Sequence, residues 1–467
     1  MASQTWDDHD RSDRYTCRDF GQNYLMSLQD EGNPIIYTNG DNDTFPLWYN
    51  QDTEGVRTDA RVCNLSYLGT DWYIDQMVRP AYESPGLPIT WPRLKYVSGT
   101  NDFVPVVPQL KDQIRAIYEQ SPEDAKNTWG EEPFELKNVL KYWVMNPVDQ
   151  QYHCIPTDSV YITIDKDAVR RSGMLIQGDS IPDRMYISLQ GQNYISKSKL
   201  MMLEMLANAN WERPIYVAMT VGGENIMNLD NHFVQEGLVY RITPYTTNAP
   251  GMTSFDTEKT YKNVMERYKF GGVSTPGIYL DETVMRMCYT HRQLMVVLAS
   301  ELAAEGDELQ QQSEYLSGAY SADGTEAGID MGKRYQEVAD SLKQTAEQKY
   351  DKALKVLEKL DKELPAENVP YDISSLTEAQ LYVQLGLPDK ARPILDYLWK
   401  HATQYVTYFE SFDDREMQQY NERCLRQFGI MRYVRSIYAF DESKKEELEQ
   451  QQMKLLETFV AKGGKLE

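Results

Sequence analysis

The strand signals of this chain stop at Gly271-Gly272, and this change constrains the fold more than any other feature. Before the two glycines, short segments rich in Val, Ile and Tyr alternate with helical patterns, whereas only helical periodicity follows them. The predicted strands lie near residues 34–38, 61–65, 159–164, 184–189, 213–219 and 237–242, and the apolar segment 198–209 predicts a buried helix. The sequence therefore predicts an α/β domain over residues 6–250, followed by an all-α domain over residues 255–467.

The helical region contains two segments that resemble the second helices of tetratricopeptide units. Ala353 and Ala391 occupy the small-residue position of these segments and lie 391 − 353 = 38 residues apart, close to the repeat of about 34 residues. An ordinary helical hairpin also uses small residues where helices pack closely, so both interpretations stay open. A stretch of acidic residues with Gly and Ser near residues 305–332 predicts a flexible insertion.

The charge of the chain narrows the classes of partner. It has 48 Lys and Arg against 71 Asp and Glu, which gives a formal net charge of −23. A nucleic-acid groove or an anionic membrane face requires clustered cations, so we expect no nucleic acid as a partner.

The longest apolar run, residues 294–304, is interrupted by Ser300 and Glu301 and falls short of the ~20 residues that span a bilayer. The abrupt opening and the closing Leu466-Glu467 predict a soluble fragment excised from a longer protein.

The turn after the first predicted strand is the sharpest local motif. Residues 39–43 read Asn-Gly-Asp-Asn-Asp and lead into a helix expected to open at Phe45-Pro46. Asp41 and Asp43 are hard oxygen ligands at D-x-D spacing, which suits a divalent cation and a nucleotide-sugar diphosphate. In the alternative interpretation, Asp43 caps the helix and Asp41 closes an Asx turn.

A second cluster lies at the start of the predicted α/β domain. Asp8, His9, Asp10 and Arg11 stand in succession in the sequence. A histidine beside carboxylates can bind a metal, and an arginine can clamp a phosphate; alternatively, these residues are solvated charges that cap the following helix. We expect Asp8, His9 and Asp10 to converge with Asp41 and Asp43 on one polar pocket, because the helix between them leads back to the same strand. Arg11, Asn39 and Asn42 are further candidate ligand-binding residues of these two motifs.

Together, several motifs resemble a known family. They are Asp7-Asp8-His9-Asp10-Arg11-Ser12, residues 37–49 (Tyr-Thr-Asn-Gly-Asp-Asn-Asp-Thr-Phe-Pro-Leu-Trp-Tyr), residues 54–59 (Glu-Gly-Val-Arg-Thr-Asp), Asn64-Leu65-Ser66 and residues 236–241 (Glu-Gly-Leu-Val-Tyr-Arg). With its helical tail, the chain resembles the C-terminal soluble region of bacterial multipass membrane proteins grouped with the transmembrane protein O-mannosyltransferases.

The resemblance implies a glycosyltransferase of the GT-C type that uses a lipid-linked sugar and carries its catalytic carboxylate on a membrane-region loop absent from this chain. We therefore expect a noncatalytic domain on the periplasmic side of the inner membrane. Its expected partners are an acceptor protein and its own membrane-spanning region upstream. Two alternatives are a self-sufficient metal-dependent nucleotide-sugar glycosyltransferase, which would use Asp41 and Asp43, and a pure protein-interaction scaffold.

Overall fold

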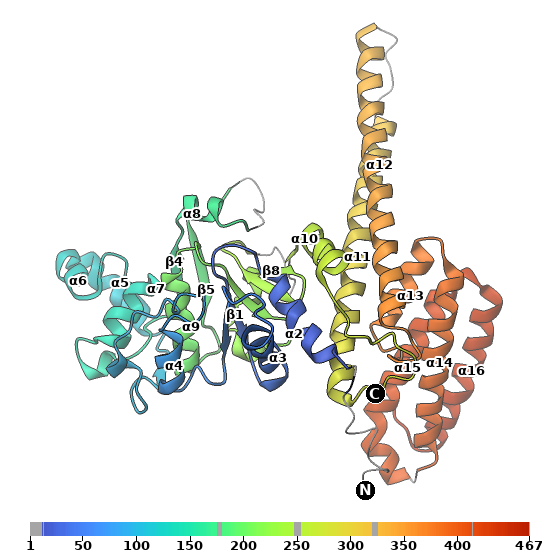
Figure 1. Cartoon of the computed structure of the whole chain (residues 1–467), viewed down its shortest axis with the longest axis horizontal. Coiled ribbons are helices and arrows are strands. Elements are labelled where there is room, and N and C mark those ends of the chain that lie inside the picture. The colour runs from blue at the N-terminus through green and yellow to red at the C-terminus, as the bar shows by residue number, and fades with distance from the viewer. Residues whose placement is uncertain are drawn as a thin grey trace. The chain divides into compact units, whose positions relative to one another are not determined.

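The computed structural model describes Ser12 and residues 14–174, 180–246, 254–319, 326–412 and 414–466. It forms two compact units, which meet in the sequence at Gly271-Gly272 (Figure 1). The first unit, residues 17–271, contains the sheets, and the unit that continues from Gly272 is all helical. The predicted order of an α/β region and an all-α region is therefore confirmed. The α/β unit extends past residue 250 because a further strand, Ser254–Phe255, pairs with the edge of the main sheet.

The main sheet of the α/β unit has six strands in the order β10-β8-β9-β7-β1-β2. Strand β1 (Ile35–Thr38) lies between β2 (Arg61–Asn64) and β7 (Ile215–Ala218) and runs parallel to both. Strand β9 (Val239–Ile242) is antiparallel to β7 and to β8 (Phe233–Glu236), and β10 (Ser254–Phe255) is parallel to β8.

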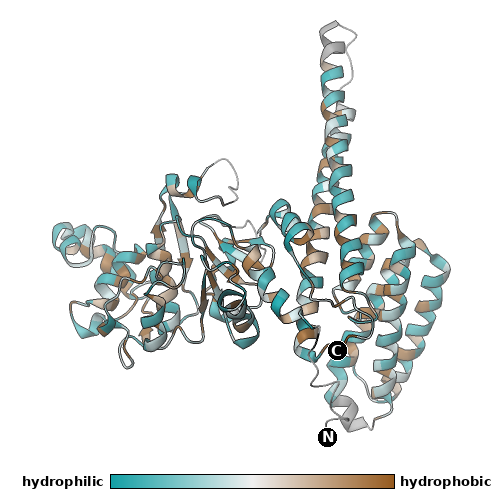
Figure 2. Ribbon diagram, viewed as in Figure 1, coloured by the Kyte–Doolittle hydropathy of each residue, from teal (hydrophilic) through white to brown (hydrophobic). Residues whose placement is uncertain are grey.

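The core lies on the faces of this sheet. All residues of β1, β2 and β7 are buried, as expected for parallel strands covered on both faces. Helix α3 (Asp41–Asp52) connects β1 to β2, and nearly all of α9 (Lys197–Asn208) is buried, which confirms the helix predicted from its apolar sequence. Figure 2 shows hydrophobic residues along the strands of this unit.

The remaining elements of the α/β unit are short. Strands β4 (Ser159–Thr163) and β5 (Arg184–Ser188) form a two-stranded antiparallel sheet, as do β3 (Phe103–Pro105) and β6 (Tyr194–Ser196), and Tyr161 of β4 also forms an isolated bridge with Glu135. The helices are α2 (Thr16–Ser27), α4 (Asp71–Met77), α5 (Leu110–Gln120), α6 (Pro122–Trp129), α7 (Leu136–Asn138), α8 (Lys166–Arg171) and α10 (Thr257–Lys262).

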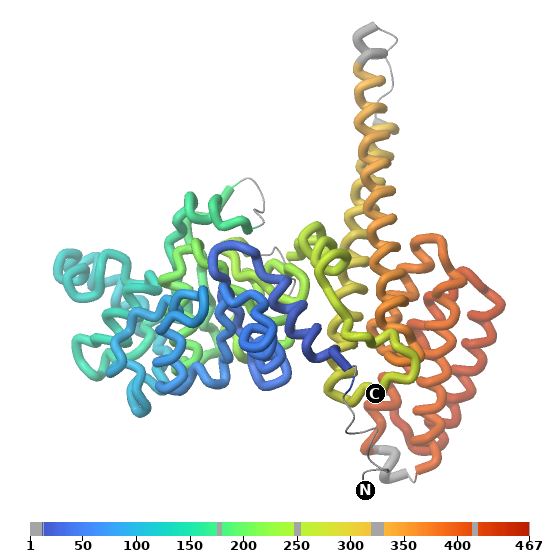
Figure 3. The backbone as a smooth tube through the Cα atoms, in the orientation of Figure 1, coloured from blue at the N-terminus to red at the C-terminus, as the bar shows by residue number. Residues whose placement is uncertain are grey.

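The helical unit begins with a long hairpin. Helices α11 (Glu282–Ala319) and α12 (Glu326–Glu363) each contain 38 residues and run side by side (Figure 3). They are followed by α13 (Ser375–Gln384), α14 (Pro388–Glu410), α15 (Asp414–Ile437) and α16 (Glu442–Ala461). A single hairpin helix is thus longer than a whole tetratricopeptide unit of about 34 residues, and the repeat prediction is not confirmed. None of the helices in the described ranges combines the length and apolar character needed to cross a bilayer.

The predicted flexible insertion at residues 305–332 is wrong for 305–319 and 326–332, which are helical; residues 320–325 lie outside the described residues. Polar groups of this segment have partners across the hairpin. Glu305 forms an ion pair with Lys349 at 2.5 Å, and Asp307 accepts a hydrogen bond from the Tyr350 hydroxyl at 2.7 Å. The acidic side chains of Glu305 and Asp307 therefore pair with the neighbouring helix α12.

Candidate binding site at the carboxyl edge of the sheet

The site lies where the order of strands reverses. The chain leaves β1 through α3 toward β2, whereas it leaves the neighbouring strand β7 toward β8 and β9 on the other side of the sheet. The loops after β1 and β7 therefore diverge, and in open α/β sheets ligands bind in the crevice between such loops. Residues 39–43 follow β1 and residues 219–221 follow β7.

Asp43 joins these two loops. Its Oδ2 accepts a hydrogen bond from the Thr220 hydroxyl at 2.7 Å and from the backbone N–H of Asn39 at 3.2 Å. The side chain is 3% exposed, and its Oδ1 is buried without a hydrogen-bond partner. Burial raises the pKa of this carboxyl group. Asp43 therefore connects the loop after β1 to the loop after β7, and its Oδ1 atom is left without a hydrogen-bond donor.

The capping role predicted for Asp43 needs correction. Helix α3 begins at Asp41 and not at Phe45, and Gly40 precedes its first residue without any side-chain cap. Gly40 has φ 94°, a left-handed conformation that favours glycine and turns the chain from β1 into the helix. Asp43 thus lies within the first helical turn, where a carboxylate is favoured by the helix dipole.

Polar side chains from the ends of three parallel strands surround Asp43. The Thr38 and Thr44 hydroxyls are 2.8 Å apart, and the Asn64 side-chain amide donates to Thr44 Oγ1 at 2.9 Å. The Ser66 hydroxyl donates to Asn39 Oδ1 at 2.7 Å. We call the following residues the carboxyl-edge cluster: Thr38, Asn39, Asp43, Thr44, Asn64, Ser66 and Thr220.

The cluster contains part of the predicted site. Asn39 and Asp43 belong to it, whereas the side chains of Asp41 and Asn42 are exposed. Asp8, His9, Asp10 and Arg11 lie outside the described residues, so their convergence with the turn stays a prediction.

The metal assignment of Asp41 and Asp43 also stays a prediction. Across the described ranges, no group of three or more His, Cys, Asp or Glu side chains is arranged to hold a metal ion. Thr38, Asp43, Thr44 and Asn64 are buried, whereas the partly exposed Asn39 and the exposed Ser66 and Thr220 are accessible for hydrogen bonding to a polar ligand.

The sequence analysis missed Thr220. It lies 177 positions after Asp43, but its position directly after the predicted strand 213–219 was the signal that could have identified it. Thr44, Asn64 and Ser66 stand inside the motifs that carry the family resemblance, although we did not predict them as site residues.

The last motif that carries the family resemblance, residues 236–241, has a structural role. Glu236 is buried, pairs with Lys259, accepts a hydrogen bond from the Tyr216 hydroxyl at 3.0 Å and lies 3.8 Å from Arg241. These contacts tie β8 to β7, β9 and α10. Residues 236–241 therefore stabilise the far half of the sheet.

One comparison with known proteins gave a match. A family model described as TMEM260-associated domain 2 matches residues 17–259, more than half of the chain. The match starts at the first residue of the α/β unit, ends within α10 and includes the whole carboxyl-edge cluster. Neither the curated proteins nor the solved structures contain a match to the chain.

Proposed function

Because the chain belongs to the family of TMEM260-associated domain 2, we propose that it is the noncatalytic soluble domain of a membrane-embedded protein O-glycosyltransferase of the O-mannosyltransferase type. In this proposal the domain lies on the periplasmic side of the inner membrane. The family name links the chain to a membrane protein, and the sequence resemblance described above supplies the type of enzyme. The catalytic carboxylate and the lipid-linked sugar belong to the membrane region upstream.

The role we propose for the α/β unit is to bind and position the acceptor protein. The observation that carries this role is the hydrogen bond between Asp43 and Thr220, which joins the loops after β1 and β7 at the reversal of strand order inside the matched residues. The partly exposed Asn39 and the exposed Ser66 and Thr220 can form hydrogen bonds with amide or hydroxyl groups of a polypeptide. In this proposal the helical unit contacts the acceptor or a further partner.

The test uses the full-length protein in cells, with glycopeptides of secreted proteins quantified by mass spectrometry. We expect Asp43→Ala and Thr220→Val each to lower glycopeptide yield at least several-fold while the protein remains at its normal abundance. Asp112→Asn, in an exposed position on α5, is the matched control and leaves the yield unchanged. Normal glycopeptide yield in both cluster variants would contradict the proposed role of the crevice.

The alternative enzyme reading has its own test. A self-sufficient nucleotide-sugar glycosyltransferase hydrolyses or transfers sugar from UDP- or GDP-sugars in the presence of Mn²⁺. We expect the purified chain to show no turnover under these conditions. Turnover that disappears in Asp41→Asn would replace our proposal with this alternative.

The scaffold alternative places the function in the helical unit alone. Truncation between Gly271 and Gly272 separates the halves, and a defined acceptor peptide from the glycopeptide analysis serves as the probe. Our proposal expects peptide binding to require the α/β unit, whereas binding by the helical half alone would favour the scaffold.

A further inference from the structure

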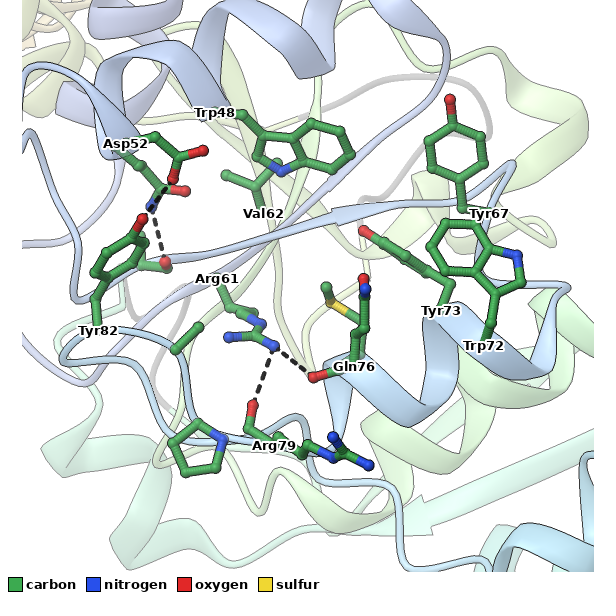
Figure 4. Close-up of a pocket in the computed structure, with 15 residues that line it drawn as sticks. Trp48, Asp52, Arg61, Val62, Tyr67, Trp72, Tyr73, Gln76, Arg79 and Tyr82 are labelled. Atoms are coloured by element: carbon green, nitrogen blue, oxygen red, sulfur yellow. Dashed lines mark hydrogen bonds between the residues drawn. The ribbon is translucent and has the colours of Figure 1, made fainter.

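A separate pocket of about 690 Å³ lies beside strand β2, at the edge of the main sheet. Helix α3, helix α4 and the turn at residues 79–82 supply its walls (Figure 4). None of the residues of the carboxyl-edge cluster lines it. Its volume falls within the range of small-molecule sites, about 300–1,000 Å³.

The floor of the pocket holds a buried arginine whose charge is not compensated. Arg61 is 5% exposed, and its Nη2 donates to the carbonyl oxygens of Gln76 at 2.9 Å and Arg79 at 3.0 Å. Its Nε and Nη1 have no hydrogen-bond partner. Burial lowers the pKa of Arg61, and in the described part of the chain no carboxylate forms an ion pair with it. A buried cation without a partner is costly, so this position is suited to an anionic ligand group.

Aromatic rings form one wall of the same pocket. The Trp48 and Tyr67 rings are stacked with centroids 6.4 Å apart, and the Trp72 ring lies 5.9 Å from Tyr67. These rings come from α3, from the loop after β2 and from α4, so three separate elements build the wall. Their faces suit the apolar C–H face of a sugar ring, while Asp52 and Gln76 are positioned among the lining residues to bind hydroxyl groups.

A strained residue lies at the opposite side of the pocket. Tyr82 has φ 52°, an unfavourable conformation for an aromatic residue, and it occupies a turn closed by two hydrogen bonds between Ala81 and Ser84. Its ring is 65% exposed, and its hydroxyl donates to Asp52 Oδ1 at 2.8 Å. Such strain, of order 1–3 kcal/mol, is concentrated at ligand sites.

We propose that this pocket binds an acidic saccharide, in which a carboxylate or phosphate pairs with Arg61 and the sugar ring lies against Trp48, Tyr67 and Trp72. Arg79 adds a second positive charge among the lining residues of a chain that is strongly acidic overall. Neighbouring atoms cover Nε and Nη1 of Arg61 in the unliganded chain, so the lining side chains shift slightly when the anion binds. The inference is independent of the proposed acceptor crevice, which other residues form.

The test measures binding to the purified full chain by isothermal titration calorimetry. The probes are methyl glucuronide for a carboxylate, mannose 6-phosphate for a phosphate and methyl glucoside as the neutral match. We expect at least one acidic sugar to bind at least tenfold more tightly than methyl glucoside, and the preferred one identifies the anionic group. Equal affinities for acidic and neutral sugars, or no binding of any probe, would overturn the proposal.

Two variants locate the binding. Arg61→Met should remove the preference for the acidic sugar, and Trp72→Ala, at an exposed position of the wall, should weaken binding of that sugar at least fivefold. Trp72→Ala keeps the test informative if Arg61→Met does not fold. Tyr194→Ala, an exposed aromatic of the same unit away from the pocket, is the matched control and leaves the affinity unchanged. Binding that is insensitive to Trp72→Ala would place the saccharide elsewhere and overturn the proposal.

Discussion

The α/β unit and the helical unit each bury an arginine, and the two arginines are used differently. In the helical unit, Arg292 is 1% exposed, and its two Nη atoms donate to the carbonyl oxygens of Pro370 and Val369 at 2.6 Å, with Asp372 at 3.7 Å. In the α/β unit, Arg61 lines a pocket and has two nitrogens without partners. Both Nη atoms of Arg292 thus have acceptors in their own chain, whereas Nε and Nη1 of Arg61 have none.

The comparison separates structural burial from functional burial. Burial alone does not distinguish the two arginines, because both side chains are almost inaccessible. The distinguishing features are the unsatisfied donors and the adjoining pocket, because natural folds pair buried polar groups unless the group serves another purpose. On this criterion Arg61, and not Arg292, is the candidate ligand-binding arginine.

The largest expected effect comes from removing the structural arginine. Arg292→Met leaves two buried carbonyl oxygens without donors, and each unsatisfied group costs about 1–3 kcal/mol. We expect the free energy of unfolding of the helical unit to fall by about 3 kcal/mol, measured by urea denaturation together with hydrogen exchange of peptides from α11.

Arg61→Met is the comparison for this variant. It also removes two hydrogen bonds to carbonyl oxygens, but it removes an uncompensated buried charge as well, and the second effect offsets the first. We expect the α/β unit to lose about 1 kcal/mol or less. A loss in Arg61→Met as large as that in Arg292→Met would contradict the distinction between the two arginines.

A smaller effect comes from a glycine at which two helices of the α/β unit touch. A Cβ atom on Gly21 of α2 would lie 2.4 Å from the backbone of Pro46 in α3. Overpacking of this kind costs typically about 1–3 kcal/mol. We expect Gly21→Ala to destabilise the α/β unit by about 2 kcal/mol in urea denaturation, because α3 must move away from α2.

Gly429 of α15 is the matched control for this variant in the helical unit. A Cβ atom there meets no atom within 4 Å, so Gly429→Ala should gain about 0.5–1 kcal/mol from helix propensity. If Gly21→Ala were as well tolerated as Gly429→Ala, the two helices would not be in the close contact described.

Local patterns in the sequence were sufficient for much of the fold near the site. The apolar run before Asn39-Gly40 predicted β1, the following residues predicted a helix and β2, and the apolar segment 198–209 predicted the buried helix α9. The strand pattern did not reveal strand partners, so nothing indicated that β4 and β5 form their own small sheet. Partner choice depends on contacts between distant segments, which periodicity does not encode.

The same limit applied to the candidate sites. Asn39 and Asp43 were predicted because they follow a strand, but their connection to Thr220 depends on β7 lying next to β1. Arg61 was missed because one charged residue at the start of a buried strand has no local signature of a binding residue. Arg61 was identified as a candidate binding residue only from its structure: the carbonyl oxygens and aromatic rings around it, and its own unpaired Nε and Nη1 atoms.

A pH-dependent effect is expected from a buried carboxyl group of the helical unit. Glu378 of α13 is 1% exposed, and its Oε2 has no hydrogen-bond partner. Burial, with a further contribution from the negative charge of Asp361, raises the pKa of Glu378 to about 8. Glu378 is thus one of several residues in the described part of the helical unit that have a buried polar atom without a hydrogen-bond partner, and its titration shows how a buried carboxyl group is tolerated there.

The sign of the pH effect follows from this raised pKa. Between the unfolded pKa of about 4.3 and the folded pKa, the folded chain retains a proton that the unfolded chain has released, so stability is complete at low pH and falls as the pH rises. The slope reaches at most about 1.4 kcal/mol per pH unit. Glu378→Gln keeps a neutral side chain at every pH, and we expect it to equal the native chain in stability near pH 4.5 and to become increasingly more stable than the native chain as the pH rises to 8.

Urea denaturation at several pH values between 4.5 and 8 measures this difference. Glu457→Gln, at an exposed position of α16, is the control for the loss of one negative charge and should follow the native pH dependence. Parallel curves for the native chain and Glu378→Gln would mean that Glu378 is ionised at neutral pH, and therefore that a cation compensates it in the folded chain. The charge of Arg292 lowers the pKa of Glu378. In that case Arg292 would therefore be the partner of Glu378 as well as the donor to the two carbonyl oxygens, and the charge of Glu378 would not be unpaired.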